Sequence, residues 1–263
     1  MTPGSPMTPG KILAITSGKG GVGKTFIAAN LAAALAARGE KVLVLDADLG
    51  LANLDVVLNL HPKITLHDVF TEKATLEQAI LPAPGGFSVL LAGSGLVEYS
   101  RLTPQVREQL IDIIAQVTPR FDRILLDTGA GISDVVLHAV SLADQVLVVV
   151  TPEPTSMTDA YATIKVLAML QGRRHIRLVI NQVSSQGEGR TIRNQLQLVV
   201  DRFVRPQLMS QGVSEALVLE LLGEIPIDAT VREAVRKRSL LLVTMPGCAA
   251  AQAITAIATK LVG

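Results

Sequence analysis

The sequence has few aromatic residues, no tryptophan and a single cysteine, Cys248. One cysteine permits no disulfide within the chain, and one thiolate cannot complete the ligand set of an iron–sulfur cluster. The charges nearly cancel, with 24 lysine and arginine residues against 23 acidic ones, so the overall electrostatics predict no strong binding to nucleic acid. These features favour a protein of a reducing, cytoplasmic compartment.

Long hydrophobic runs are also missing. Apolar segments such as Val146–Val150 are far shorter than the roughly 20 residues of a membrane-spanning helix, and no signal peptide is evident. Residues 1–10 repeat the letters M-T-P-G, so we expect a disordered tail there, with Met7 as an alternative translation start. We expect residues 11–263 to fold as a single domain, because no linker or shift in composition interrupts them.

Aliphatic residues and alanine dominate what is present, and apolar strands alternate with helical segments as in repeated βαβ units. This pattern predicts an α/β fold of three layers, with a mostly parallel twisted sheet and helices on both faces. The strands are expected at Lys11–Thr16, Lys41–Asp46, Phe87–Leu91, Arg123–Asp127, Gln145–Val150, Ile176–Val183 and Leu219–Ile225. The helices are expected at Phe26–Arg38, Leu66–Phe70, Leu76–Ile80, Pro104–Val117, Asp134–Leu142, Ser156–Leu170, Arg190–Arg205, Val231–Arg238 and Ala249–Val262, with a loop-rich stretch at Gly50–Pro62.

A glycine-rich loop between the first strand and the first helix carries the strongest functional signal. It matches the pattern G-x-x-x-x-G-K-[ST] with the residues Gly18, Lys19, Gly20, Gly21, Val22, Gly23, Lys24 and Thr25. In this pattern backbone N–H groups surround a polyphosphate, the final lysine contacts the outer phosphates and the hydroxyl ligates Mg²⁺. A chance glycine-rich turn is the alternative. The order strand, loop, helix favours a nucleoside triphosphate at the helix N-terminus, with Phe26 as a further contact.

Acidic residues end two of the expected strands. Asp46 and Asp48 follow the second strand, where a period of two places them on one side, and Asp127 ends the strand that begins at Arg123. Ligands bind at this edge of open α/β sheets, so the carboxylates can hold the metal and orient the attacking water. An Asp-rich turn that merely ends a strand is the alternative.

The loop with two lysines resembles the deviant phosphate-binding loop of the MinD/ParA group of ATPases, and the letters D-x-D-x-G and D-T-G-A-G-I-S resemble the two switch regions of that group. The resemblance implies the P-loop NTPase fold, with ATP and Mg²⁺ as ligands. In the group the extra lysine, here Lys19, reaches across a dimer interface to the partner's nucleotide, and the second aspartate of the first switch, here Asp48, orients water. The resemblance therefore implies that Lys19, Lys24 and Asp48 are catalytic residues and that Thr25, Asp46 and Asp127 bind the metal.

The resemblance also predicts how the base is bound. In the family an asparagine at the position of Asn181 contacts the adenine ring, and the loop after the last strand, with Pro226 and Asp228, lines the base. Each of these sites is otherwise a turn that ends a strand. Glu153, at the edge of another strand, is a candidate contact to the ribose of the dimer partner.

One branch of the group fits best. The segments Asp46–Leu58, Thr151–Tyr161 and Ile225–Val235 resemble FlhG, also called FleN or YlxH, whose members set the number and placement of bacterial flagella. The resemblance implies an ATP-dependent homodimer that works with an FlhF-type GTPase, with flagellar switch (C-ring) proteins or with a flagellar transcription activator.

Two departures from the branch affect the expected partners. The start of the chain lacks the motif with which FlhG proteins stimulate FlhF, and Ala249–Val262 has Lys260 as its only charge, unlike a basic membrane-binding helix. We therefore expect a core helix at the C-terminus, and membrane contact at the inner face or the cell pole stays open. A division-site or partitioning ATPase of MinD or ParA type and an ATP-dependent small-molecule enzyme are the alternatives.

Overall fold

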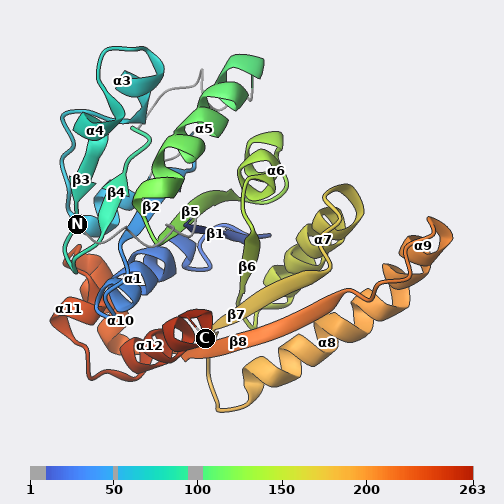
Figure 1. Ribbon diagram of the computed structural model, residues 1–263. Coiled ribbons are helices and arrows are strands. Elements are labelled where there is room, and N and C mark those ends of the chain that lie inside the picture. The colour runs from blue at the N-terminus through green and yellow to red at the C-terminus, as the bar shows by residue number, and fades with distance from the viewer. Residues whose placement is uncertain (1–9, 50–52, 94–102, 263) are drawn as a thin grey trace, which may run out of the picture.

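The structure, a computed structural model, describes residues 10–49, 53–93 and 103–262 (Figure 1). The expected tail at residues 1–9 and the glycine at position 50 lie outside the described residues. Gly10, which we expected in the tail, belongs to the folded part, because it is buried and its N–H donates to the carbonyl of Thr118 at 3.2 Å.

The described strands form one sheet in the order β3-β4-β2-β5-β1-β6-β7-β8, and every neighbouring pair is parallel except β3 and β4. They are β1 (Lys11–Ser17), β2 (Val42–Ala47), β3 (Ile80–Pro82), β4 (Ser88–Leu90), β5 (Arg123–Ala130), β6 (Gln145–Val150), β7 (His175–Val183) and β8 (Val218–Pro226). The central strands are buried along nearly their whole length, because helices cover both faces.

Two helical layers enclose the sheet (Figure 1). One layer contains α1 (Lys24–Ala36), α2 (Leu54–Leu58), α10 (Ala229–Arg236), α11 (Leu241–Thr244) and α12 (Ala249–Val262). The other layer contains α3 (Leu66–Phe70), α4 (Leu76–Ala79), α5 (Pro104–Val117), α6 (Asp134–Ser141), α7 (Pro154–Leu170), α8 (Glu188–Phe203) and α9 (Arg205–Ser210). The fold is therefore the expected three-layer α/β arrangement.

The core is divided by the sheet into two apolar clusters. In β1, Leu13 and Ile15 face the cluster around α1 and α12, whereas Ile12 and Ala14 face the cluster around α5 to α8. Successive side chains of a strand point to opposite faces, so one strand supplies both cores. Burying a side chain as large as Leu13 contributes roughly 1.5–3 kcal/mol to the free energy of folding. The two packed layers therefore fix the positions of the strand ends at the edge of the sheet.

Several expected boundaries are wrong. Ile80, expected at the end of a helix, begins the antiparallel strand β3, because a three-residue strand carries too little alternation to be recognised. The short helix α2 lies inside the stretch that we expected to be loop-rich, and α9 and α11 were not expected at all. The expected core helix at the C-terminus is confirmed, since α12 buries an apolar face that includes Ile254 and Ile257.

Candidate nucleotide site

The glycine-rich loop joins the end of β1 to the start of α1. Gly21 and Gly23 have φ angles of 78° and 97°, in the left-handed region that favours glycine. Gly23 is the N-cap of α1 and provides no side-chain hydrogen bond to the first turn. The first N–H groups of α1 are consequently available to an anion, and the helix dipole favours one there.

The glycines of the loop differ in what surrounds them. A Cβ atom at Gly18 would overlap the backbone of Asp159 in α7, and one at Gly23 would lie 2.6 Å from Nδ2 of Asn181. Nothing lies within 4 Å of the corresponding position at Gly20 or Gly21. Gly18 therefore allows the loop to pack against α7, whereas Gly20 and Gly21 leave room for a ligand.

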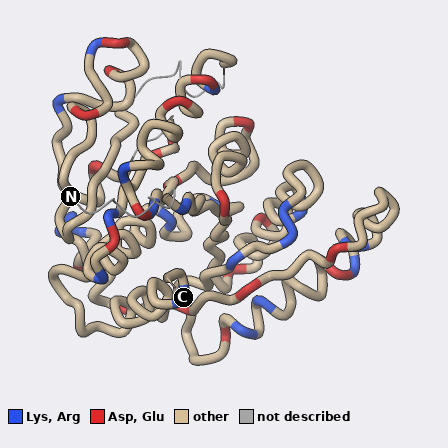
Figure 2. The backbone as a smooth tube through the Cα atoms, viewed as in Figure 1, with Lys and Arg blue, Asp and Glu red and all other residues tan. Residues whose placement is uncertain are grey.

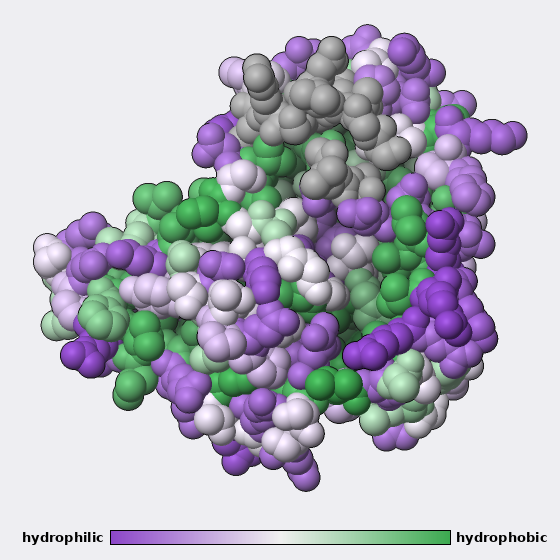
Figure 3. All heavy atoms as spheres, turned by 180° about the vertical axis from the view of Figure 1, so that it is seen from behind, coloured by the Kyte–Doolittle hydropathy of each residue, from purple (hydrophilic) through white to green (hydrophobic). Residues whose placement is uncertain are grey.

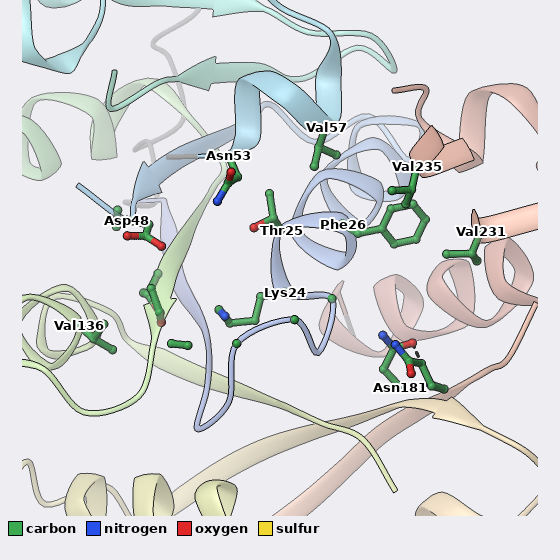
Figure 4. Close-up of a pocket in the computed structure, with 18 of the residues that line it drawn as sticks. Lys24, Thr25, Phe26, Asp48, Asn53, Val57, Val136, Asn181, Val231 and Val235 are labelled. Atoms are coloured by element: carbon green, nitrogen blue, oxygen red, sulfur yellow. Dashed lines mark hydrogen bonds between the residues drawn. The ribbon is translucent and has the colours of Figure 1, made fainter. Parts of the chain in front are cut away.

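A cavity of about 1200 Å³ lies between this loop, the ends of β2 and β5, and α10 (Figure 4). Lys24, Thr25 and Asp48 lie toward one end, while Phe26, Val231 and Asn181 lie toward the other. The view from behind shows hydrophobic side chains gathered beside the hollow on that side of the molecule (Figure 3). The cavity thus has a charged end and an apolar end.

Asp46 and Asp127 lie near the charged end of the cavity, beside Lys24. The strand expected to end at Asp127 continues to Ala130, because its pairing with the neighbouring strands extends past that residue, so both aspartates lie inside their strands. Asp46 and Asp127 are register partners on β2 and β5 and are 1% and 2% exposed. Burial, reinforced by the Asp127 charge, raises the pKa of Asp46 well above its usual value. Burial also raises the pKa of Asp127 to about 7, although the Thr25 hydroxyl donates to its carboxylate and Lys24 lies nearby. Two acids this close are costly unless they share protons or a cation.

The same carboxylates fit a divalent cation. Oδ2 of Asp46 and Oδ1 of Asp127 are buried and have no hydrogen-bond partner among the described residues. A hard cation such as Mg²⁺ prefers oxygen ligands and would satisfy such atoms. Thr25, Asp46 and Asp127 therefore form a donor set suited to the metal that the sequence predicted.

Lys24 lies in this acidic environment and is only 9% exposed. Burial lowers the pKa of its amine, while the charges of Asp127 and Asp48 oppose that change. Asp48 lines the cavity as expected, although for a different reason. β2 ends at Ala47, so the loop after the strand, rather than the strand's period of two, places Asp48 there, with its N–H donating to Oδ1 of Asp46 at 3.2 Å.

Lys19 points elsewhere. Its Nζ lies 2.5 Å from Oε2 of Glu153 and 3.0 Å from Oγ1 of Thr155, and it is not among the residues that line the cavity. The side chains of Lys19 and Glu153 are 37% and 59% exposed. Lys19, the extra lysine of the loop, is therefore held at the surface of its own chain and away from its own nucleotide cavity.

Two of the residues expected around the base, Asn181 and Asp228, also form hydrogen bonds that connect segments of the fold. Nδ2 of Asn181 donates to the carbonyl of Val22 at 2.8 Å, so Asn181 supports the glycine-rich loop from β7. Pro226 and Asp228 line the cavity. The Asp228 carboxylate accepts from the N–H of Thr230 at 2.9 Å and of Ala250 at 3.2 Å, which joins the starts of α10 and α12.

Other lining residues were missed by the sequence reasoning. Val57 from α2 and Val231 and Val235 from α10 complete the apolar end of the cavity, and Arg232 from α10 also lines it. Val235 is 54% exposed, although Val231 and Val235 lie one turn apart and form the apolar stripe of a helix. The apolar stripe of α10 is visible in the sequence. The sequence alone does not show that the core leaves this stripe uncovered, so it could not identify Val231 and Val235 as lining residues.

The described residues hold neither a cluster of three or more metal-ligating acids, histidines or cysteines nor a helix that could span a membrane. Within residues 10–49, 53–93 and 103–262, no three histidine, cysteine, aspartate or glutamate side chains are grouped as a metal site would require. No helix in the same ranges combines the length and the apolar character needed to cross a bilayer.

Comparisons with known proteins agree on one family. A family profile described as ParA, NUBPL iron-transfer P-loop NTPase, matches residues 9–262. The antiactivator FleN of Pseudomonas aeruginosa is 41% identical over 254 residues, which cover 97% of this chain and 87% of FleN. The flagellum site-determining protein YlxH of Helicobacter pylori is 34% identical over 96% of this chain and 82% of YlxH.

A solved structure supports the same assignment. The septum site-determining protein MinD of Pyrococcus horikoshii, in complex with Mg-ADP, superposes with a TM-score of 0.74 at 28% identity, covering 95% of each chain. The fold described above is thus shared with a protein whose structure contains Mg-ADP. The chain belongs to the MinD/ParA family of P-loop ATPases, in the branch that contains FleN and YlxH.

Proposed function

We propose that this protein is an ATP-dependent, dimerising switch that controls the number and placement of bacterial flagella. One observation carries the switch part of the proposal. Lys24 lies inside the nucleotide cavity, whereas Lys19 of the same loop lies outside it in an exposed ion pair. One loop thus holds one lysine for its own nucleotide and one that a partner can reach.

The roles at the charged end follow from the positions of the side chains. Lys24 and the N–H groups at the start of α1 bind the phosphates, and Asp48 orients the attacking water. Thr25, Asp46 and Asp127 would hold Mg²⁺, which when bound neutralises charge on the β- and γ-phosphate oxygens. At the other end, Asn181, Pro226, Asp228 and Phe26 surround the base.

The switch depends on the γ-phosphate. Lys19 leaves Glu153 and contacts the phosphates of the partner subunit, while Glu153 becomes free to contact the partner's ribose. Because the γ-phosphate adds contacts only in the closed dimer, ATP favours the dimer and its hydrolysis returns the monomer. The dimer then presents a surface that its partner proteins recognise.

The flagellar role is supported by the relatives. FleN is described as an antiactivator, and YlxH as a flagellum site-determining protein. The partners that fit this role are an FlhF-type GTPase, C-ring switch proteins or a flagellar transcription activator. We place the protein in the cytoplasm, with peripheral association at the membrane or the cell pole as an open part of the proposal.

Deletion of the gene tests this role directly. Electron micrographs of the deletion strain are scored for flagellar number, flagellar position and minicells in the same images. Altered flagella with normal division are expected, and a plasmid copy of the gene should restore the normal count. Minicells with normal flagella would contradict the flagellar role and assign the protein to cell division, without affecting the ATPase argument.

A further inference from the structure

A second groove lies along the outer edge of the sheet, away from the nucleotide cavity. It has a volume of about 860 Å³ and is lined by residues of β8, α8 and α12. Both helices lie beside β8 (Figure 1). We call it the β8 groove and define it by the residues Arg190, Arg193, Val218, Leu221, Ile257 and Lys260. Its volume falls in the range typical of ligand sites, roughly 300–1000 Å³.

Side chains already pair with several outward backbone groups in the first half of β8 and with the carbonyl of Leu217 just before it. The Gln197 amide accepts from the N–H of Leu219 at 2.9 Å and donates to the carbonyl of Leu217 at 2.9 Å. Arg193 Nε donates to the carbonyl of Leu219 at 2.6 Å, and Lys260 Nζ to that of Leu222 at 2.6 Å. An edge strand with these groups paired is protected against addition of another strand. An occupant of the groove is therefore recognised through side chains.

The acidic residues of the groove are already engaged. Glu220 pairs with His175 at 3.0 Å and with Arg177 at 3.1 Å. The Glu224 carboxylate accepts from the N–H groups of Gly187 and Gly189 at 2.9 and 2.8 Å. Both acids keep their charge, but neither forms an ion pair with Arg190, Arg193 or Lys260 among the described residues.

The cations, in contrast, have no carboxylate partner within the described part of the chain. Arg193 and Lys260 donate to neutral oxygens, and the side chain of Arg190 has no hydrogen bond or ion pair there. The basic positions in the first half of α8 lie next to β8 (Figure 2). A carboxylate is a better acceptor for these groups than a backbone carbonyl, because a hydrogen bond between two charged groups is the stronger one.

From this arrangement we infer that the β8 groove binds an extended peptide of another protein, one that carries carboxylates next to apolar side chains. The carboxylates bind Arg190, Arg193 and Lys260, and the apolar side chains pack on Val218, which is 45% exposed, and on the half-buried Leu221. The chain's own residues 1–9 do not fit this role, because they contain no acidic residue. The groove is a second site, and it does not depend on the proposed function of the nucleotide cavity.

Selection of peptides from a random library tests this inference. Phage-displayed 12-residue peptides are selected on the full-length protein, and the enriched peptides are measured by fluorescence anisotropy. We expect enriched sequences with net negative charge and apolar residues. Their affinity should fall at least tenfold in Arg190→Glu and in Lys260→Gln.

Arg202→Glu is the matched control, because it makes the same charge change on the same helix outside the groove. It should leave peptide affinity unchanged, and the ATPase rate of Arg190→Glu should equal that of the unmodified protein. Enrichment of neutral or basic peptides, or equal affinity for the protein and Arg190→Glu, would overturn the inference. So would binding of phosphatidylglycerol vesicles, lost in Arg190→Glu, without any enriched acidic peptide, because the groove would then serve a lipid surface.

Discussion

Two lysines of one loop, five residues apart, have opposite environments. Lys24 is 9% exposed and lies among Asp48 and Asp127 at the charged end of the cavity. The Lys19 side chain is 37% exposed and pairs with Glu153 at the surface. A lysine enclosed by carboxylates is positioned to contact the phosphates bound to its own chain. The exposed ion pair of Lys19 with Glu153 contributes little free energy and can be replaced by another contact. This difference between the two lysines is what the proposed sharing of the loop between two subunits requires.

The largest effect is expected at the enclosed lysine. Lys24→Ala should weaken ATP binding by about a hundredfold, because a charge-assisted hydrogen bond contributes roughly 1.5–3 kcal/mol and each factor of ten corresponds to about 1.4 kcal/mol. Isothermal titration calorimetry measures the affinity. Lys11→Ala is the control, since Lys11 is exposed at the opposite end of β1 and should leave the affinity unchanged. Equal ATP affinity in Lys24→Ala and the unmodified protein would remove Lys24 from the site.

The acids around Lys24 predict a pH dependence of stability in the absence of nucleotide and metal. The pKa of Asp127 is about 7 in the folded protein and near 3.8 when unfolded. Between these values only the folded state holds the proton, so the free energy of unfolding falls as pH rises, by about 1.4 kcal/mol per unit for one proton, and levels off above pH 7. Urea titrations from pH 5 to 8 measure this change.

Asp127→Asn is the variant that isolates this effect. In this variant the free energy of unfolding should fall less steeply with pH, by about the contribution of one proton. The contribution of Asp46, whose pKa is also raised, should remain. If the variant and the unmodified protein showed the same dependence on pH, Asp127 would not be the titrating group.

A smaller effect is expected at the exposed lysine. Lys19→Ala should leave ATP affinity of the monomer within about twofold, because Lys19 does not line the cavity. It should weaken the ATP-dependent dimer by about tenfold, the size of one charge-assisted contact. Analytical ultracentrifugation with ATP and Mg²⁺ gives the dimer association constants of the variant and of the unmodified protein. Lys11→Ala is again the control. A dimer of normal strength in Lys19→Ala would show that the two lysines do not divide their roles between subunits.

The smallest effect is expected at Glu153. Glu153→Gln should change the free energy of unfolding of the monomer by less than about 1 kcal/mol, because an exposed ion pair contributes little. It should weaken the ATP-dependent dimer by a few fold, since the contact to the partner's ribose is lost. A dimer of unchanged strength would contradict the ribose contact. A tighter dimer would instead show that Glu153 restrains Lys19 in the monomer.

The sequence predicted the charged end of the cavity more accurately than the apolar end. The glycine-rich loop, Asp46 and Asp127 were predictable, because the carboxyl ends of parallel strands meet at one edge whatever the details of packing. The support of the loop by Asn181 and the joining of α10 to α12 by Asp228 were not predictable. Those hydrogen bonds connect segments far apart in the chain, and only the tertiary structure brings them together.

The fold shows the same division between local and distant effects. Long apolar strands such as β6 were recognised, whereas β3 was missed because its three residues form a strand only by pairing with β4. Arg173 is a further example, because its guanidinium donates to the carbonyl of Ala143, 30 residues away. Neighbours that are distant in sequence decided these cases.

The mass of the Asp48→Ala protein in solution tests the central claim most directly. Size-exclusion chromatography with light scattering is run with ATP and Mg²⁺, with ADP and Mg²⁺, and without nucleotide. Because Asp48 orients water but does not hold the phosphates in this account, the variant should bind ATP, fail to hydrolyse it and remain a dimer. It should be a monomer with ADP, and adding Lys19→Ala to it should shift the ATP form toward the monomer, because that change weakens the dimer by about tenfold. A monomer in every condition, for a variant shown to bind ATP, would contradict the claim that ATP closes two subunits around this loop.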